Sequence, residues 1–150
     1  MPAIDGYEFP DGLWYDPEEH LWLAPGPAGS GGTPTVTVGL DALGAEALGE
    51  VVYIQLVDPG VPLQRGQALG SLEAEKMVRP VLAPLSGRVA EVNARLLEAP
   101  RLLNTDPYGG GWLVRVTAER WEAEAPRLLT GADAVAAWAR AELAAHRERP

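Results

Sequence analysis

Glycine and proline interrupt this chain so often that few segments can form anything longer than a short strand. The 150 residues include 17 Gly and 14 Pro. Between the breaks lie apolar and β-branched runs, several of them alternating, which is the composition of strands. These runs cover residues 13–15, 21–23, 35–40, 50–56, 67–74, 78–83 and 112–117. The pattern predicts a mainly β domain in which short strands are joined by turns.

A weak internal repeat indicates how the strands are arranged. The run Gly49-Glu50-Val51-Val52-Tyr53-Ile54 is echoed by Gly87-Arg88-Val89-Ala90-Glu91-Val92, 38 positions later. Two similar runs of strands favour two related β-layers packed face to face. We therefore expect a flattened barrel or sandwich of two small antiparallel sheets.

Helical patterns appear inside the strand region and after it. Residues 41–49 read as a short helix that Asp41 can cap and Gly49 can end. Residues 25–34 read as a loop and 96–103 as a short helical or looped connection. From Ala118 the composition favours helices, and a capping box at Thr130–Asp133 predicts one that runs to about Arg147 and packs on the β-core. We divide the chain into an N-terminal arm (1–12), a β-domain (13–117) and a helical extension (118–150).

Composition excludes several functions. The chain contains no Cys, so it can form neither a disulfide nor a thiolate metal site, and any redox chemistry needs a borrowed cofactor. Its net charge of -9 disfavours nucleic acid and anionic membranes as partners. No segment reads as a signal peptide or a membrane-spanning helix, so we expect a cytoplasmic protein. The two histidines, His20 and His146, do not predict a metal site.

Lys76 is the only lysine in the chain, and every other strongly basic residue is arginine. A primary amine can be acylated, whereas a guanidinium stays charged and unreactive. Lys76 lies between two short predicted strands, which would place it at an exposed hairpin tip on a rigid scaffold. The sequence therefore predicts a covalent attachment point at Lys76. The alternative is a surface lysine that has no function.

A set of motifs occurs in a fixed order around the lysine. Glu73 lies three positions before the lysine and Gly66 ten before it. The other segments of the set are His20-Leu21-Trp22, residues 38–52, Ala83-Pro84-Leu85-Ser86-Gly87, Val89-Ala90-Glu91-Val92-Asn93 and residues 103–113 with Asn104, Pro107 and Tyr108. Over roughly residues 13–117, these motifs in this order resemble the biotinyl/lipoyl carrier superfamily, and most closely the glycine cleavage H-protein family.

This resemblance implies lipoate joined by an amide to Lys76. It implies a carrier subunit rather than an enzyme, with Glu73, Glu75, Gly66 and Gly87 shaping the hairpin and its recognition by the lipoate-attaching enzyme. The implied partners are glycine decarboxylase, aminomethyltransferase and dihydrolipoyl dehydrogenase, which load, unload and reoxidise the arm. The implied cargo is the aminomethyl group of glycine.

Two departures from the family pattern keep other functions open. Leu21 and Pro80 stand where the family has acids thought to hold the loaded amine, and neither side chain can accept a hydrogen bond; Glu19 is a candidate replacement. The alternatives are a lipoyl carrier for lipoyl relay or sulfur metabolism, and an interaction protein that is not modified. The segment Glu73-Ala74-Glu75-Lys76-Met77 also approaches the biotin-carrier motif, which makes a biotin carrier a further alternative.

Overall fold

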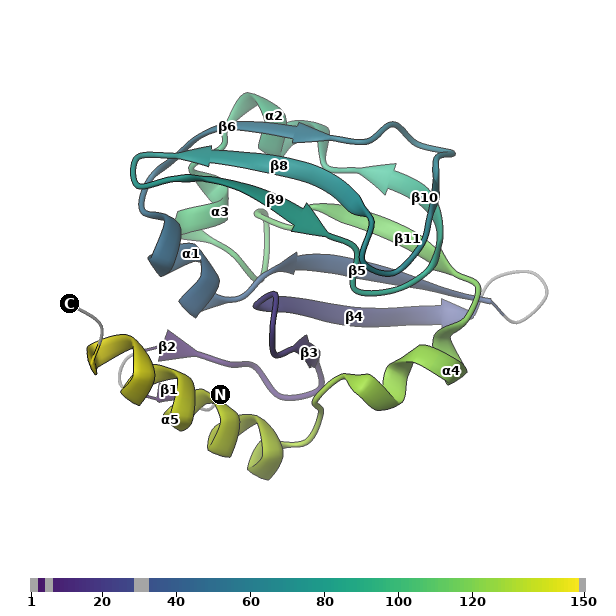
Figure 1. The fold of residues 1–150 in the computed structure, drawn as a ribbon. Helices are drawn as coiled ribbons and strands as arrows, with labels where there is room; N and C mark the ends of the chain where they lie inside the picture. The colour runs from purple at the N-terminus through teal and green to yellow at the C-terminus, as the bar shows by residue number, and fades with distance from the viewer. Residues whose placement is uncertain (1–2, 5–6, 29–32, 149–150) are drawn as a thin grey trace.

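Two antiparallel sheets face each other in the computed structural model, which describes residues 3–4, 7–28 and 33–148 (Figure 1). The larger sheet has six strands, in the spatial order β3 (Trp14–Asp16), β4 (Leu21–Ala28), β5 (Pro34–Leu40), β11 (Val114–Ala118), β10 (Gly87–Val92) and β7 (Pro62–Leu63). The smaller has three, in the order β6 (Val51–Leu56), β8 (Ala68–Ala74) and β9 (Val78–Leu82).

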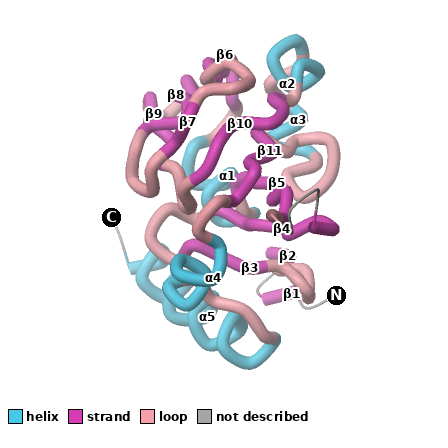
Figure 2. Tube along the Cα trace, turned by 90° about the vertical axis from the view of Figure 1, so that its right-hand side faces the viewer, coloured by secondary structure: helices cyan, strands magenta, loops and turns pink. Residues whose placement is uncertain are grey.

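The predicted fold class is confirmed in its sandwich form. Within the described ranges no strand pairing joins the two sheets into a closed barrel. The two repeated runs lie in different layers, since β6 belongs to the three-stranded sheet and β10 to the six-stranded one. Seen from the side in Figure 2, the six-stranded sheet lies between the smaller sheet and the C-terminal helices.

The helices occupy the margins of this sandwich. They are α1 (Ala42–Leu48), α2 (Ala94–Glu98), α3 (Leu102–Thr105), α4 (Trp121–Glu124), the short 3₁₀ turn η2 (Ala125–Arg127) and α5 (Ala132–Glu148). The predicted caps of the first helix are both present: the Asp41 carboxylate accepts a hydrogen bond from the Gly44 N–H at 2.8 Å, and Gly49 ends α1 in a left-handed conformation. The helix is thereby fixed between β5 and β6.

Apolar side chains on the two faces of the six-stranded sheet belong to two different clusters. Along β4, Leu21 and Leu23 belong to the cluster between the sheets, whereas Trp22 belongs to a second cluster on the other face. This alternation follows from the two-residue period of a strand. The second cluster includes three side chains of α5 spaced one helical turn apart, Val135, Ala139 and Leu143. The predicted packing of the C-terminal helix on the β-core is therefore confirmed.

The N-terminal residues do not form the extended arm that the sequence suggested. The strands β1 (Ala3–Ile4) and β2 (Tyr7–Glu8) pair with each other, and Phe9 is buried in the second cluster. Its ring meets Tyr15 and Trp138 edge-on, with centroids 6.0 and 5.8 Å apart. A single buried aromatic residue produces no periodic pattern, so the sequence did not reveal this contact.

Two further expectations need correction. Residues 25–34 are not all loop, because β4 continues to Ala28 and pairs there with Pro34. The capping box predicted at Thr130–Asp133 does not begin the last helix as expected, because α5 starts at Ala132 and Gly131, not Thr130, directly precedes it. The Thr130 hydroxyl instead donates to the Leu13 carbonyl at 3.2 Å, which ties the C-terminal segment to the residue before β3. The three-part division of the chain stays a prediction. Its first and last parts contribute to the same apolar cluster.

Candidate functional site

Lys76 lies at the tip of the hairpin formed by β8 and β9. The last cross-strand pair before the tip is Glu73 opposite Val78, and the Ala74 N–H donates to the Met77 carbonyl at 2.9 Å. The side chain of Lys76 is exposed. The predicted hairpin is therefore present, and it holds the amine outside the sandwich.

Helix α1 supports the hairpin tip through backbone contacts. The Lys76 N–H donates to the carbonyl of Leu48 at 3.4 Å, and its Nζ donates to the carbonyl of Glu46 at 3.5 Å. Glu75 exchanges two hydrogen bonds with Glu50: its N–H donates to the Glu50 carbonyl at 3.0 Å, and its Oε1 accepts from the Glu50 N–H at 3.3 Å. Glu75 is thus used to attach the tip to the end of α1.

Gly49 makes this attachment possible. Its φ of 77° is in the left-handed region, and a Cβ at this position would lie 2.6 Å from Glu75 Oε1. Any larger residue would both strain the backbone and push the Glu75 carboxylate away. The glycine that ends α1 therefore also determines how closely the lysine hairpin approaches the helix.

Asn104 and Tyr108 hold the two ends of α1, although the sequence analysis did not single them out as site residues. At the C-terminal end, Asn104 Nδ2 donates to the Gly49 carbonyl at 2.7 Å and its Oδ1 accepts from the Val51 N–H at 2.9 Å. At the N-terminal end, the Tyr108 hydroxyl accepts from the Ala42 N–H at 2.9 Å. The sequence signal that could have identified both residues is their position in the 103–113 motif.

The amine of Lys76 is free for chemistry. Among the described residues, no carboxylate lies within ion-pairing distance of its Nζ, whose one hydrogen bond there is to the Glu46 carbonyl. Acylation would therefore break no salt bridge. Beside the tip, a groove of about 400 Å³ runs along α1 and is lined by Tyr7, Ala45, Glu46, Gly49 and Asn104 among others.

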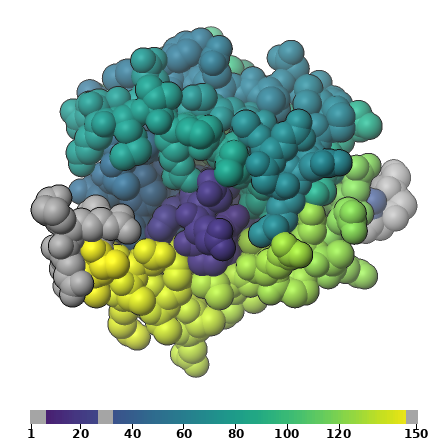
Figure 3. Space-filling view, viewed as in Figure 1, coloured from purple at the N-terminus to yellow at the C-terminus, as the bar shows by residue number. Residues whose placement is uncertain are grey.

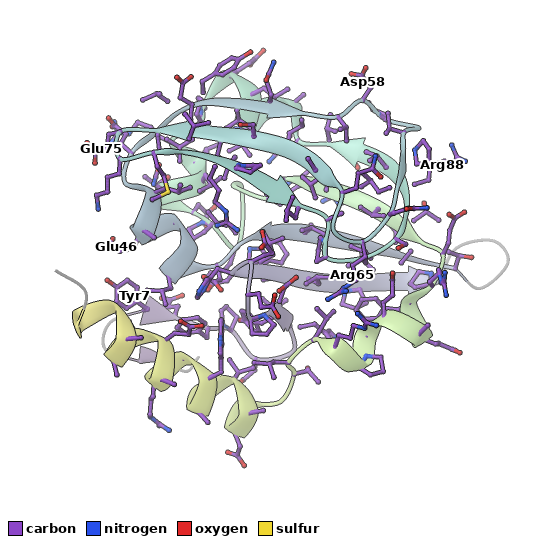
Figure 4. All side chains as sticks on the ribbon, in the orientation of Figure 1. Tyr7, Glu46, Asp58, Arg65, Glu75 and Arg88 are labelled. Atoms are coloured by element: carbon purple, nitrogen blue, oxygen red, sulfur yellow. The ribbon has the colours of Figure 1, made fainter. Side chains whose placement is uncertain are left out.

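The other predicted site residues lie in two different places. Glu73 is exposed on the outer face of the three-stranded sheet, close to the lysine. Gly66 precedes β8 and Gly87 follows β9, so both lie far from the lysine end of the hairpin. Their chain neighbours Arg65 and Arg88 lie on the opposite side of the molecule from Glu75 in Figure 4. Gly66 N–H donates to the Ala83 carbonyl at 2.8 Å, and a Cβ on Gly87 would lie 1.9 Å from the Thr117 carbonyl oxygen. Gly66 therefore lies at the base of the hairpin, whereas Gly87 begins β10 and permits the close approach of β11.

Known proteins are similar to this chain in sequence and in fold. A model of the glycine cleavage H-protein family matches residues 15–140. The glycine cleavage system H protein 2 of Aquifex aeolicus is 35% identical over 130 residues, which cover 87% of this chain and 78% of that protein. The H protein of Micrococcus luteus is 44% identical over 108 residues, covering 72% of this chain and 80% of its own length. The chain belongs to the glycine cleavage H-protein family.

A solved structure agrees with this assignment. The crystal structure of a glycine cleavage system H protein from Mycobacterium marinum superposes with a TM-score of 0.72 at 32% sequence identity. The match covers 85% of this chain and 96% of that one. The resemblance found from the motifs is thus confirmed over both the sequence and the fold.

The two positions that depart from the family pattern offer no carboxylate. Leu21 is fully buried in the cluster between the sheets, and Pro80 is exposed on β9. Glu19 does not supply an unpaired carboxylate in their place, because its carboxylate forms an ion pair with Arg79. The Arg79 guanidinium donates to the Glu19 carbonyl, and its Nη2 lies 3.4 Å from Glu19 Oε1. This contact joins β9 to the turn before β4, and Figure 3 shows that N-terminal region between the smaller sheet and α5.

His20 has a structural role in the same turn. It adopts a left-handed φ of 57°, and its N–H donates to the Asp16 carbonyl at 2.9 Å. Its Nδ1 lies 3.3 Å from Oδ2 of the fully buried Asp41, and its Nε2 lies 3.9 Å from Glu142 Oε1. Burial lowers the pKa of His20, but the negative charges of Asp41 and Glu142 beside it outweigh burial and raise it.

Other kinds of site find no support in the described part of the chain. It contains no group of three or more His, Asp or Glu side chains that could hold a metal ion. None of its helices is long and apolar enough to cross a membrane.

Proposed function

We propose that Lys76 carries lipoate through an amide bond and that the chain is the carrier subunit of a glycine cleavage system. The observation that carries this proposal is the single, exposed lysine at the tip of a hairpin, which forms no ion pair with any described residue, in a chain of the glycine cleavage H-protein family. Lipoate would supply the redox-active sulfur that this cysteine-free chain lacks.

The contribution of the protein would be to position the arm. The backbone contacts of Lys76 and Glu75 with α1 hold the attachment point still, so that only the lysine side chain and its acyl group move. A tethered group reaches several active sites at a high effective concentration without dissociating from its carrier. The proposed partners are glycine decarboxylase, aminomethyltransferase, dihydrolipoyl dehydrogenase and a lipoate-attaching enzyme.

The attachment is tested by the intact mass of the protein purified from its native host. We expect the mass of a lipoyl amide, and no such increment in the Lys76→Arg variant, which keeps a positive charge but cannot be acylated. An unmodified Lys76 in cells with an active lipoate-attaching enzyme would refute the carrier function. A biotin increment would instead assign the chain to carboxylases.

The cargo is tested by reconstitution. The lipoylated protein, mixed with glycine decarboxylase and labelled glycine, should support release of labelled carbon dioxide above the level of the Lys76→Arg variant. This assay is separate from the mass measurement. A lipoylated protein that supports no release would refute the proposed cargo but not the proposed attachment site.

A second candidate function is a lipoyl carrier that serves lipoyl relay rather than glycine cleavage. It is favoured by the surroundings of the hairpin, where Leu21 is buried, Pro80 has no acceptor and Glu19 is paired with Arg79. Transfer of lipoyl groups from this chain to another carrier protein, without glycine decarboxylation, would establish this alternative.

A further inference from the structure

The imidazole of His20 lies between two helices that are far apart in the sequence. On the side of α1, a Cβ on Gly44 would lie 3.0 Å from His20 Cβ, and the His20 carbonyl accepts from the Asp41 N–H at 2.8 Å. On the side of α5, the imidazole and the Trp138 ring have centroids 5.3 Å apart and planes inclined by 33°. We name His20, Asp41, Trp138 and Glu142 the His20 cluster. It joins the C-terminal helix to the helix that supports the lysine hairpin.

Two carboxylates face this one imidazole. Asp41 Oδ2 lies 3.3 Å from Nδ1, and Glu142 Oε1 lies 3.9 Å from Nε2. The Asp41 side chain is fully buried, whereas that of Glu142 keeps 30% of its exposure. Within the described ranges, neither Asp41 Oδ2 nor His20 Nδ1 forms a hydrogen bond with any further group. A protonated histidine carries an N–H on both ring nitrogens, so it can interact with both carboxylates at once.

A neutral His20 can donate to only one of them. One ring nitrogen then keeps its N–H and the other presents a lone pair. The proton stays on Nδ1, because a buried Asp41 carboxylate without a donor costs more free energy than a Glu142 carboxylate that water can hydrate. The lone pair of Nε2 then faces Glu142. Loss of one proton therefore weakens the contact with α5 and keeps the contact with α1.

Trp138 responds to the charge of His20 in the same direction. A cation over an indole face is attracted by the electron density of the ring, and a neutral imidazole lacks this attraction. The indole Nε1 of Trp138 also donates to Glu142 Oε1 at 3.3 Å, so the two α5 side chains are held in one arrangement. Both contacts of His20 with α5 are therefore stronger when His20 is protonated.

The other charged groups around His20 do not reverse this direction. Arg79 on β9 disfavours the protonated imidazole, but its guanidinium forms an ion pair with Glu19. Asp16, at the start of the turn, uses its Oδ1 to accept from the Glu18 and Glu19 N–H groups at 3.1 Å. The balance of all these charges and of burial raises the pKa of His20.

We propose that the His20 cluster is a proton-dependent attachment for the C-terminal helix. With His20 protonated, Glu142 and Trp138 hold α5 against the turn before β4. When the proton leaves, Glu142 turns to solvent and the end of α5 separates more readily from the second apolar cluster, in which Leu143 is buried. Helix α1 keeps its cap, because Asp41 Oδ1 accepts from the Gly44 N–H at 2.8 Å in either case. This inference does not depend on the group that Lys76 carries.

The charge contact is tested by NMR titration of the full-length protein. The chain has only two histidines, so the His146→Asn variant assigns both imidazole signals. Glu142→Gln removes one carboxylate at nearly constant shape and should lower the pKa of His20. The control Glu98→Gln removes an exposed carboxylate on α2 and should leave that pKa unchanged. An unchanged His20 pKa in Glu142→Gln would overturn the proposal.

The movement of the helix is tested by hydrogen–deuterium exchange, with labelling times scaled to the intrinsic exchange rate at each pH. Exchange in α5 should accelerate roughly two- to fivefold relative to α1 as pH rises above about 6.5, which is the effect expected for losing a partly exposed ion pair. In His20→Asn, a residue that tolerates the left-handed φ, this ratio should stay high and constant with pH. Equal acceleration of α1 and α5, or the wild-type pH dependence in His20→Asn, would contradict the proposed attachment.

Discussion

Replacing Asn104 by Ala should destabilise the protein by about 2 kcal/mol. The half-buried amide makes two hydrogen bonds to backbone groups at the end of α1, with the Gly49 carbonyl at 2.7 Å and the Val51 N–H at 2.9 Å. A hydrogen bond contributes roughly 0.5–1.5 kcal/mol net, and two such bonds add to about 2 kcal/mol. In a protein of this size that loss lowers the melting temperature by about 4–8 °C.

Urea unfolding at neutral pH measures this change directly. The midpoint should fall at an unchanged m-value, because the variant exposes no more surface on unfolding than the wild type. Hydrogen exchange should accelerate at the Val51 amide, which loses its acceptor. The neighbouring Thr105→Ala is the matched control: it removes an exposed hydrogen bond to the Arg101 carbonyl and should cost less than about 0.5 kcal/mol.

Two results would refute the reasoning for Asn104. One is an Asn104→Ala variant within about 0.5 kcal/mol of the wild type, which would mean that water replaces both hydrogen bonds. The other is a stable Asn104→Asp variant, because aspartate keeps the acceptor for Val51 but turns a carboxylate toward the Gly49 carbonyl. We expect this variant to lose at least as much stability as the alanine variant.

Three further predictions concern the scaffold around the lysine. Gly49→Ala should cost more than about 1 kcal/mol, because it combines a left-handed φ with a contact of 2.6 Å to Glu75 Oε1; denaturation shows this, and a neutral variant would contradict it. Leu48→Ala should cost about 2–5 kcal/mol through the cavity it leaves, by the same measurement. The raised pKa of His20 means that the folded state binds its proton more tightly than the unfolded state. Its contribution to the free energy of unfolding is complete below about pH 6.5 and is lost as pH rises through the folded pKa, so His20→Asn should remove this slope above about pH 6.5.

Short-range sequence signals were sufficient for most elements of the sandwich. The runs of β-branched residues form strands. Asp41 begins α1 and Gly49 ends it, as their capping preferences predict. The end of β4 and the N-terminal pair β1–β2 were missed, because their pairing depends on partners that the local composition does not specify. Strand ends are decided by the neighbouring strand as much as by their own residues.

The lysine site likewise has features that local sequence predicts and features that it does not. The position of Lys76 at an exposed tip follows from the turn residues and strands around it, and it was predicted before any contact was known. The closeness of α1 to that tip could not be predicted, since Lys76 meets the Glu46 carbonyl across 30 positions of the chain. Such a contact depends on how distant elements pack.

By itself, the sequence predicted a mainly β chain of two small sheets with a single primary amine at a hairpin tip, and it showed a resemblance to lipoyl carriers. The tertiary structure decided what surrounds this amine. It paired Glu19 with Arg79, buried Leu21 and aligned Tyr53, Glu73 and Val78 in one row. The physical reason is the separation along the chain of the residues that interact. Turns and caps are encoded by neighbouring residues, whereas charge pairing and exposed surfaces arise only when separate strands are brought into register.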